Sequence, residues 1–141
     1  MSEDDFNLQR FVDAQGPTYE TARSELARGR KTSHWIWFIF PQMHGLGQSA
    51  RSQKYGIRSR EEALAYLAHP ILGSRLLECT SLVNRCKDAP IGDVLPYPDD
   101  MKFHSSMTLF HAVSSRQEFA DALDRFFGGA RHEATLALLR L

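Results

Sequence analysis

The chain has 141 residues and a mass of 16.0 kDa. Because a typical domain takes roughly 100 to 200 residues, we expect a single domain spanning 1–141. Hydrophobic residues make up 43% and charged residues 24%, a globular composition that excludes disorder over most of the length. Seventeen Lys and Arg balance seventeen Asp and Glu, which argues against a dedicated binder of nucleic acid or of an anionic membrane.

Charge is distributed unevenly along the chain. Residues 21–60 hold eight basic side chains and one acid, Glu25, whereas residues 91–124 hold six acids and two basic side chains. Either the two stretches neutralise each other across the folded surface, or the basic stretch attracts an anion or an acidic partner.

Cysteine spacing and the length of the apolar runs indicate in which cellular compartment the protein is expected. Cys79 and Cys86 lie seven residues apart in a segment expected to be helical, which separates their Cα atoms by about 10 Å, too far for a disulfide. The acidic start, residues 1–5, is unlike a signal peptide. The longest apolar run, residues 35–40, is far short of the roughly twenty residues of a membrane helix. We therefore expect a soluble cytoplasmic protein with free thiols.

The first third of the chain predicts two helices and one ambiguous segment. Apolar residues at near-helical spacing follow two acids and indicate an amphipathic helix around residues 6–12, which Gly16-Pro17 ends. A second helix is expected over 19–28. The run Trp35–Phe40 fits a buried strand or a buried helix, and its aromatic and β-branched content favours a strand.

Capping signals define the middle of the chain. After a glycine-containing loop over 43–48, Ser49 is placed to cap a short helix that reaches Tyr55. Ser59 and Glu62 form a capping box for a helix over 60–68. Apolar spacing over 72–83 then predicts the main core helix.

The last third predicts a loop and three more helices. Three prolines mark 89–98 as a surface loop. A helix beginning at Asp99 carries an apolar stripe of Phe103, Met107 and Phe110. Ser115, with Glu118 completing a capping box, is expected to open a helix that ends before Gly128, and a final helix covers 131–141. Six or more helices without repeated strand signals predict an all-α class, as a compact multihelical single domain.

Two segments carry candidate binding groups. In Gly45-Leu-Gly-Gln-Ser49, backbone N–H groups and a hydroxyl could meet a phosphate or carboxylate, although the glycines could equally serve a tight turn. Gln42 and His44 belong to the same loop region. On the helix from Asp99, Lys102 is placed to bind an anion or to link helices.

The same helix offers candidate acid–base groups. A 100° step places Asp100 and His104 on one side, where they could pair at i, i+4, or they could be ordinary polar side chains of the helix face. His104 and His111 are roughly 10 Å apart, so we expect no shared metal ion. Ser106 lies four residues after Lys102, and the two would act as nucleophile and base only if the lysine were desolvated.

Four aromatic side chains could stack on a ring-bearing ligand. They are Trp35, Trp37, Tyr55 and Tyr66. Aromatic residues beside an apolar run usually belong to the core, which is the structural alternative for all four.

Several sequence blocks resemble one family. They include residues 5–15, 33–42, 62–70 and 102–110, and the blocks Trp-Ile-Trp-Phe-Ile-Phe-Pro-Gln and Ser-Ser-Met-Thr-Leu-Phe are specific. Over nearly the whole chain the sequence resembles domain-of-unknown-function family 1810, whose members are often labelled calpastatin, although a packed globular composition does not fit that extended inhibitor. The resemblance implies a compact multihelical fold, and hence a helix over 35–40, but no activity.

The leading functional hypothesis is a polar cleft, between the loop of residues 41–55 and the helix from Asp99, that binds a small anionic metabolite such as a nucleotide. The candidate ligand-binding residues are Gln42, His44, Gly45, Gly47, Ser49, Tyr55 and Ser106, and the candidate catalytic residues are Asp100, Lys102 and His104. We expect neither a cofactor nor a metal. One alternative is a non-enzymatic interaction module that uses residues 21–60, and a weaker one is a nucleotide or ADP-ribose N-glycosidase. Whether the protein is an enzyme, and its oligomeric state, stay open.

Overall fold

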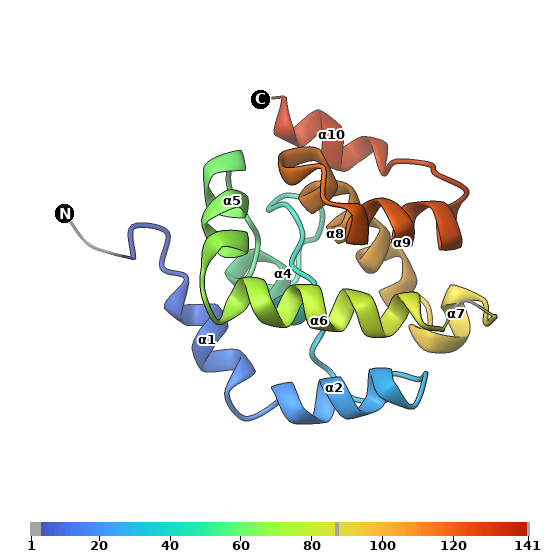
Figure 1. Ribbon diagram of the computed structural model, residues 1–141. Helices are drawn as coiled ribbons and strands as arrows, with labels where there is room; N and C mark the ends of the chain where they lie inside the picture. The colour runs from blue at the N-terminus through green and yellow to red at the C-terminus, as the bar shows by residue number, and fades with distance from the viewer. Residues whose placement is uncertain (1–3, 87, 141) are drawn as a thin grey trace.

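The computed structural model describes residues 4–86 and 88–140 and folds them into ten α-helices with no strand (Figure 1). Residues 1–3, part of the acidic start, and Leu141, the end of the expected last helix, lie outside the described residues. The helices are α1 Gln9–Gln15, α2 Tyr19–Ala27, α3 Ile36–Ile39, α4 Ala50–Lys54, α5 Arg60–Ala68, α6 Leu72–Asn84, α7 Ile91–Val94, α8 Asp99–Ser114, α9 Gln117–Phe127 and α10 Glu133–Leu139. The predicted all-α class is confirmed.

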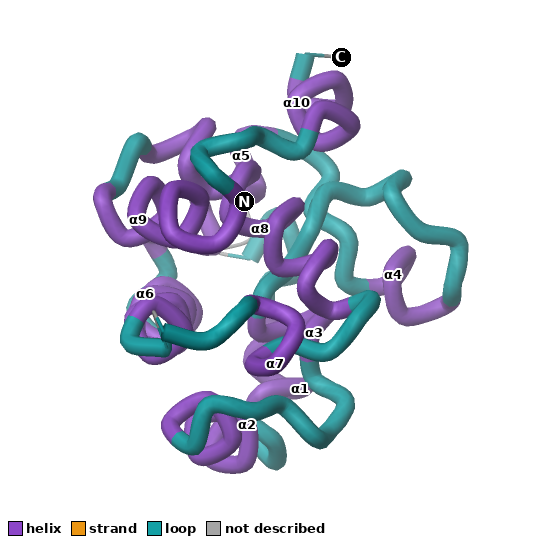
Figure 2. Tube along the Cα trace, turned by 90° about the vertical axis from the view of Figure 1, so that its right-hand side faces the viewer, coloured by secondary structure: helices purple, strands orange, loops and turns teal. Residues whose placement is uncertain are grey.

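The two longest helices organise the domain. Helix α6 crosses the molecule and packs against α2, α5 and α9 (Figure 1), and α8 packs against α5, α9 and α10. Turned by 90°, the molecule shows the loop that precedes α4 extending to one side, with α8 between it and α9 (Figure 2). The helices therefore enclose a core on one side of α8 and leave its other side facing that loop.

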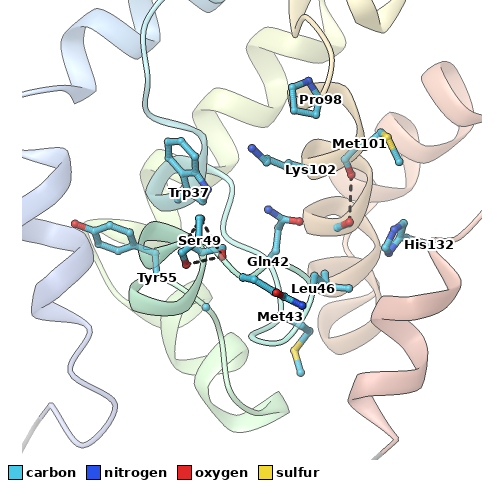
Figure 3. A pocket seen from close by; sticks show the side chains of 15 residues that line it. Trp37, Gln42, Met43, Leu46, Ser49, Tyr55, Pro98, Met101, Lys102 and His132 are labelled. Atoms are coloured by element: carbon cyan, nitrogen blue, oxygen red, sulfur yellow. Dashed lines mark hydrogen bonds between the residues drawn. The ribbon is translucent and has the colours of Figure 1, made fainter.

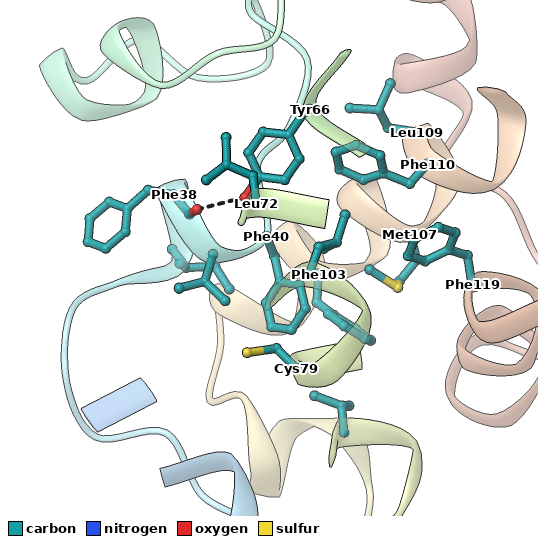
Figure 4. Packing of buried hydrophobic residues seen from close by; sticks show 14 of the residues in the cluster. Phe38, Phe40, Tyr66, Leu72, Cys79, Phe103, Met107, Leu109, Phe110 and Phe119 are labelled. Carbon is teal, nitrogen blue, oxygen red and sulfur yellow. Dashed lines mark hydrogen bonds between the residues drawn. The ribbon is translucent and has the colours of Figure 1, made fainter. Parts of the chain in front are cut away.

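Aromatic rings fill the core (Figure 4). Phe103 packs edge-on against Phe40 with 4.9 Å between ring centroids. Phe110 lies 5.6 Å from Tyr66 and 5.8 Å from Phe119. All five side chains are fully buried. The stripe predicted from the spacing of α8 is thus the centre of the core, where large rings supply much of the hydrophobic stabilisation.

The segment 35–40 is a single helical turn, as the family resemblance implies and against its local strand propensity. The turn ends where Phe38 O accepts hydrogen bonds from Gln15 Nε2 at 2.6 Å and from the Tyr66 hydroxyl at 3.0 Å. Both donors are buried, so these bonds satisfy a carbonyl that the short helix leaves unpaired. Contacts with residues distant in the sequence therefore decide the conformation of residues 35–40.

The first helix begins later than predicted. Phe6 lies outside it and is exposed, because Asn7 adopts a positive φ of 54° and the helix starts at Gln9. The Asp4 carboxylate accepts hydrogen bonds from the backbone N–H groups of Leu8 and Gln9. The acidic cap was predicted correctly, but its helix lies one turn further along the chain.

The expected surface loop over 89–98 is partly wrong. It contains α7, and Val94 and Leu95 are fully buried. Pro90 sits at the N-terminal end of this short helix, where a proline is tolerated because its missing N–H would have no helical partner. Val94 O accepts a hydrogen bond of 2.7 Å from the backbone N–H of Lys31.

Of the two predicted capping boxes, one is confirmed. Ser59 Oγ accepts from the N–H of Glu62 at 3.0 Å, and the Glu62 carboxylate accepts from the N–H of Arg58 at 2.9 Å. The box at Ser115 is wrong. Ser115 takes a left-handed conformation that ends α8, and α9 starts at Gln117 with no side-chain cap.

Glu25, the lone acid of the basic stretch, is 2% exposed and fastens the loop after α2. Its carboxylate accepts from the backbone N–H groups of Thr32 and Ser33, from the Ser33 hydroxyl at 2.5 Å and from Trp35 Nε1 at 3.0 Å. Burial acts to raise the pKa of Glu25, but the hydrogen bonds from Ser33, Thr32 and Trp35 outweigh it and lower the pKa to about 2.

We predict that Glu25→Gln lowers the free energy of unfolding at pH 7 by about 2–4 kcal/mol. The NH₂ group of the new amide would face the N–H and O–H groups that donate to the carboxylate in the wild type. The folded pKa lies below the unfolded one, so the carboxylate's contribution is fully present above about pH 4.5 and is lost as the pH falls toward 2. Urea unfolding at several pH values should show the difference between wild type and variant shrinking across that window. A difference that stays constant from pH 7 to pH 3 would contradict this.

The contact between α5 and α6 requires a glycine. A Cβ atom at Gly73 would lie 2.0 Å from Leu67 O. We predict that Gly73→Ala destabilises the protein by about 1–3 kcal/mol in urea unfolding. Gly92 is the matched control, because a Cβ there meets nothing within 4 Å and Gly92→Ala should be neutral or stabilising by about 0.5–1 kcal/mol. Equal effects of the two changes would refute the close approach.

Candidate functional site

A cavity of about 320 Å³ opens between the loop after α3, the first turns of α8 and the start of α10 (Figure 3). Its lining combines aromatic, apolar and polar side chains with one lysine. The lining residues are Trp37, Gln42, Met43, Leu46, Gly47, Gln48, Ser49, Ser52, Tyr55, Gly56, Pro98, Met101, Lys102, Ser105 and His132. The two segments that the sequence singled out as a cleft therefore face each other.

The loop wall is held by backbone and capping bonds. His44 N donates to Ile57 O and Ile57 N donates to Gln42 O, both at 2.8 Å, which ties the two ends of the loop together. Ser49 Oγ accepts from Ser52 N at 3.1 Å and so caps α4, as predicted. A Cβ on Gly47 would lie 2.8 Å from Ser52 Oγ, so the turn needs glycine. These bonds shape the cavity wall without any ligand.

Lys102 supplies the cation of the lining. Its Nζ lies 4.7 Å from the centre of the Trp37 ring and 3.6 Å from Asp99 Oδ1. The second oxygen of Asp99 lies 2.6 Å from Lys31 Nζ, and the Lys31 side chain is only 6% exposed. One carboxylate is thus shared by two ammonium groups, which leaves this cluster with a net charge of +1 beside the cavity.

The four aromatic candidates divide into two pairs. Trp35 and Tyr66 are fully buried and belong to the core. Trp37 and Tyr55 are half-buried and line the cavity (Figure 3). Besides Lys102, the Arg51 guanidinium lies 5.1 Å from the centre of the Trp37 ring. Of the four, only the Trp37 ring is therefore placed to contact a ligand in this cavity, because the Tyr55 ring points away from it and packs against Phe11 and Phe38 (Figure 3).

Asp100 and His104 do not line the cavity, and no hydrogen bond joins them. The Asp100 carboxylate accepts from Met101 N at 2.8 Å. His104 Nε2 donates to Ala130 O at 2.7 Å, and its ring stacks on Phe127 with 4.1 Å between centroids. Helical spacing placed the two residues on one side of α8, but Phe127 at the end of α9 and Ala130 after it contact the imidazole instead.

Three further candidates lie away from the cavity lining. His44 holds the loop through its backbone, and a Cβ on Gly45 would meet Leu138 rather than the cavity. Ser106 is fully buried, and its neighbour Ser105 lines the cavity in its place, donating to Met101 O at 3.1 Å. Of the proposed pair of Lys102 and Ser106, only Lys102 reaches the cavity.

His132 lines the cavity and was missed in the sequence. It precedes α10, where nothing in the local pattern distinguishes it, and it reaches the cavity because α10 packs against α8. Burial lowers the pKa of His132, and the nearby His104, with 5.7 Å between ring centroids, lowers it further. The imidazole is therefore neutral at pH 7.

The described residues offer little for metal binding or for thiol chemistry. Among residues 4–86 and 88–140, no three His, Cys, Asp or Glu side chains gather to hold a metal ion. Burial raises the pKa of Cys79 to about 12, so this thiol is not a nucleophile at neutral pH. Within the same part of the chain, no helix combines the length and apolar character needed to cross a membrane.

The fold and the cavity together define a small all-α protein with a partly aromatic, singly cationic pocket. The chain belongs to the family described as protein of unknown function DUF1810, whose family model matches residues 5–139. Its structure is similar to the crystal structure of the conserved hypothetical protein Rv1873 from Mycobacterium tuberculosis, with 48% sequence identity, a TM-score of 0.96 and coverage of 98% of this chain and 99% of that one. A comparison with curated proteins gave no match.

The charge cluster beside the cavity yields a stability prediction. We expect Asp99→Ala to lower the free energy of unfolding by about 3 kcal/mol, because it leaves the Lys31 ammonium buried without its counterion. Asp100→Ala is the control and should cost less than about 1 kcal/mol, since Asp100 has no ion pair among the described residues. Adding Lys31→Met to Asp99→Ala should recover part of the loss. Failure of the double variant to recover any stability would contradict the role of this ion pair.

Proposed function

We propose that this protein binds a small anionic metabolite that carries a planar ring, such as a nucleotide, in the cavity between the loop of residues 42–56 and α8. The observation that carries the proposal is the Lys102 ammonium, which lies 4.7 Å from the centre of the Trp37 ring beside a cavity of about 320 Å³. Small-molecule sites are concave, largely apolar and furnished with a few polar groups that fix orientation.

Each wall of the cavity has a separate role in the proposal. Lys102 attracts the anionic group, and its charge is only partly offset because Asp99 is shared with Lys31. Trp37 contacts the planar ring, while Gln42 and Ser49 offer polar groups from the loop. Asp100 and His104 lie outside the lining, so the proposal assigns binding and no chemical step. The free thiols of Cys79 and Cys86 support a reducing cytoplasm as its location.

A groove beside the cavity favours a second candidate function. It is lined by His34, Arg51 and Lys54, without an acid among its lining residues. An acidic protein segment docking there would make the chain an interaction module that uses the basic stretch 21–60. Such docking weakens as salt shortens the Debye length below about 10 Å, whereas binding in the partly enclosed cavity depends less on salt.

A thermal-shift panel tests the proposal, with nucleotides, sugar phosphates, carboxylates and divalent metals as probes. A ligand at 100 times its Kd adds about 2.7 kcal/mol of stability, which is a shift of several degrees for a chain of this size. We expect ring-bearing anions to give the largest shift, Lys102→Ala to abolish it and Ser49→Ala to reduce it.

Lys54→Ala is the matched control for this experiment, because Lys54 lines the groove and not the cavity. It should leave the shift intact. A panel without any shift would refute ligand binding in the cavity and favour the interaction module. A shift that Lys54→Ala removes and Lys102→Ala leaves unchanged would do the same.

A further inference from the structure

Gln42 belongs to the loop wall of the cavity, and the backbone fixes its position. Its carbonyl oxygen accepts a hydrogen bond of 2.8 Å from the N–H of Ile57. The next residue, Met43, forms an isolated β-bridge with Ile57 and is buried. The Gln42 side chain is half-buried, and its amide end points into the cavity, between Trp37 and α8 in the view of Figure 3. The loop therefore presents this amide to the cavity before any ligand binds.

The serine hydroxyls of the lining donate their protons within the protein. Ser49 Oγ donates to Ser52 Oγ at 3.1 Å, and Ser52 Oγ donates to Ser49 O at 2.9 Å. Ser105 Oγ donates to Met101 O at 3.1 Å. A ligand that takes a proton from one of these hydroxyls must therefore break an existing hydrogen bond.

The Gln42 amide, in contrast, is free to bind a ligand. Neither its oxygen nor its NH₂ group has a hydrogen-bond partner among the described residues. Gln48, the other glutamine of the lining, is exposed. None of the described residues that line the cavity is Asp or Glu. The loop wall thus offers a neutral donor beside a neutral acceptor, and the lining offers no carboxylate for an ammonium group.

We infer that the Gln42 amide binds the edge of the ligand's ring, and that this ring is a nucleobase or a related heterocycle with a hydrogen-bond donor beside an acceptor. The inference rests on the proposed function and narrows its ligand class. A carboxamide forms two parallel hydrogen bonds with such an edge, as glutamine does with N6 and N7 of adenine. A plain aromatic ring has no group that pairs with the amide and would leave it without a partner.

The order of donor and acceptor on the ring edge is left open by the amide. Because no described residue holds either end of the Gln42 amide, rotation by 180° about its last side-chain bond exchanges the oxygen and the NH₂ group. Adenine, with an NH₂ group beside a ring nitrogen, and hypoxanthine, with a carbonyl beside a ring N–H, therefore both fit. The unsubstituted purine ring of a nucleotide has acceptors only and forms one hydrogen bond at most.

Three nucleotides test the inference: the 5′-monophosphates of adenosine, inosine and purine riboside. They offer the same phosphate to Lys102 and a purine ring to Trp37, and they differ in the groups around C6. Isothermal titration calorimetry should show wild-type protein binding the adenosine and inosine nucleotides about tenfold more tightly than the purine riboside nucleotide. This ratio lies toward the lower end for a bidentate pair, because a half-buried amide is partly solvated.

Gln42→Met removes both polar groups of the amide and keeps a side chain of similar length. It should lower the affinities for the adenosine and inosine nucleotides to about that of the purine riboside nucleotide, so that the ratio falls to about one. A merely structural role for Gln42 would weaken all three nucleotides alike and leave the ratio unchanged. Gln9→Met is the matched control, because Gln9 is exposed on α1 outside the cavity lining, and it should retain the wild-type ratio.

The possible failures of the inference and of the proposed function can be distinguished. Equal binding of the three nucleotides by wild-type protein, with changes at the Trp37 indole, would overturn the inference and leave the proposed function standing. A ratio that survives Gln42→Met, or that Gln48→Met abolishes in its place, would overturn the inference as well. Failure of wild-type protein to bind any ring-bearing anion would remove the proposed function together with the inference.

Discussion

The Asp99 carboxylate, shared between Lys31 and Lys102 at the start of α8, is the interaction on which the site depends. One oxygen lies 2.6 Å from the nearly buried Lys31 ammonium and the other 3.6 Å from that of Lys102. The first contact joins α8 to the loop after α2, and the second holds Lys102 over Trp37. A buried pair of this kind costs desolvation and adds little net stability, but breaking one side is expensive, so it fixes a unique arrangement.

Helix α8 serves two environments at once. Phe103, Met107 and Phe110 pack into the core, where Phe103 meets Phe40 and Phe110 meets Tyr66 (Figure 4). Other positions of its first turns, Lys102 and Ser105 among them, line the cavity. Because tight core packing permits little movement of α8, the lysine is placed by the fold rather than by a ligand. The cavity is thereby preorganised on its α8 wall.

Local signals in the sequence were sufficient for much of the fold. Ser49 and Ser59 cap their helices because a hydroxyl before a helix satisfies a free N–H wherever that helix lies. The apolar stripe of α8 was equally readable from its spacing. Ser115 shows the limit of such signals, because its left-handed conformation ends α8 and a capping motif does not reveal that. Val94 and Leu95 pack into the core, which the neighbouring prolines do not indicate.

The two segments of the predicted cleft line one cavity, but several of the candidate residues do not. The loop around Ser49 and the start of α8 face each other across the cavity, and glycine and charged residues had marked both segments in the sequence. His104 points elsewhere because Ala130 and Phe127, distant in sequence, engage its ring. His132 enters the cavity for the converse reason, since it is the packing of α10 on α8 that brings it there. Contacts between segments far apart in the chain leave no recognisable pattern in the local sequence, so they could not be predicted from it.

Mapping of backbone and indole N–H chemical shifts during titration with adenosine 5′-monophosphate tests the central claim most directly. The account predicts that the largest changes fall on the Trp37 indole, the amides around Gly47 and Lys102, and those next to His132. Changes concentrated instead around Asn84 and Arg125, which line a separate pocket between α6 and α9, would contradict it.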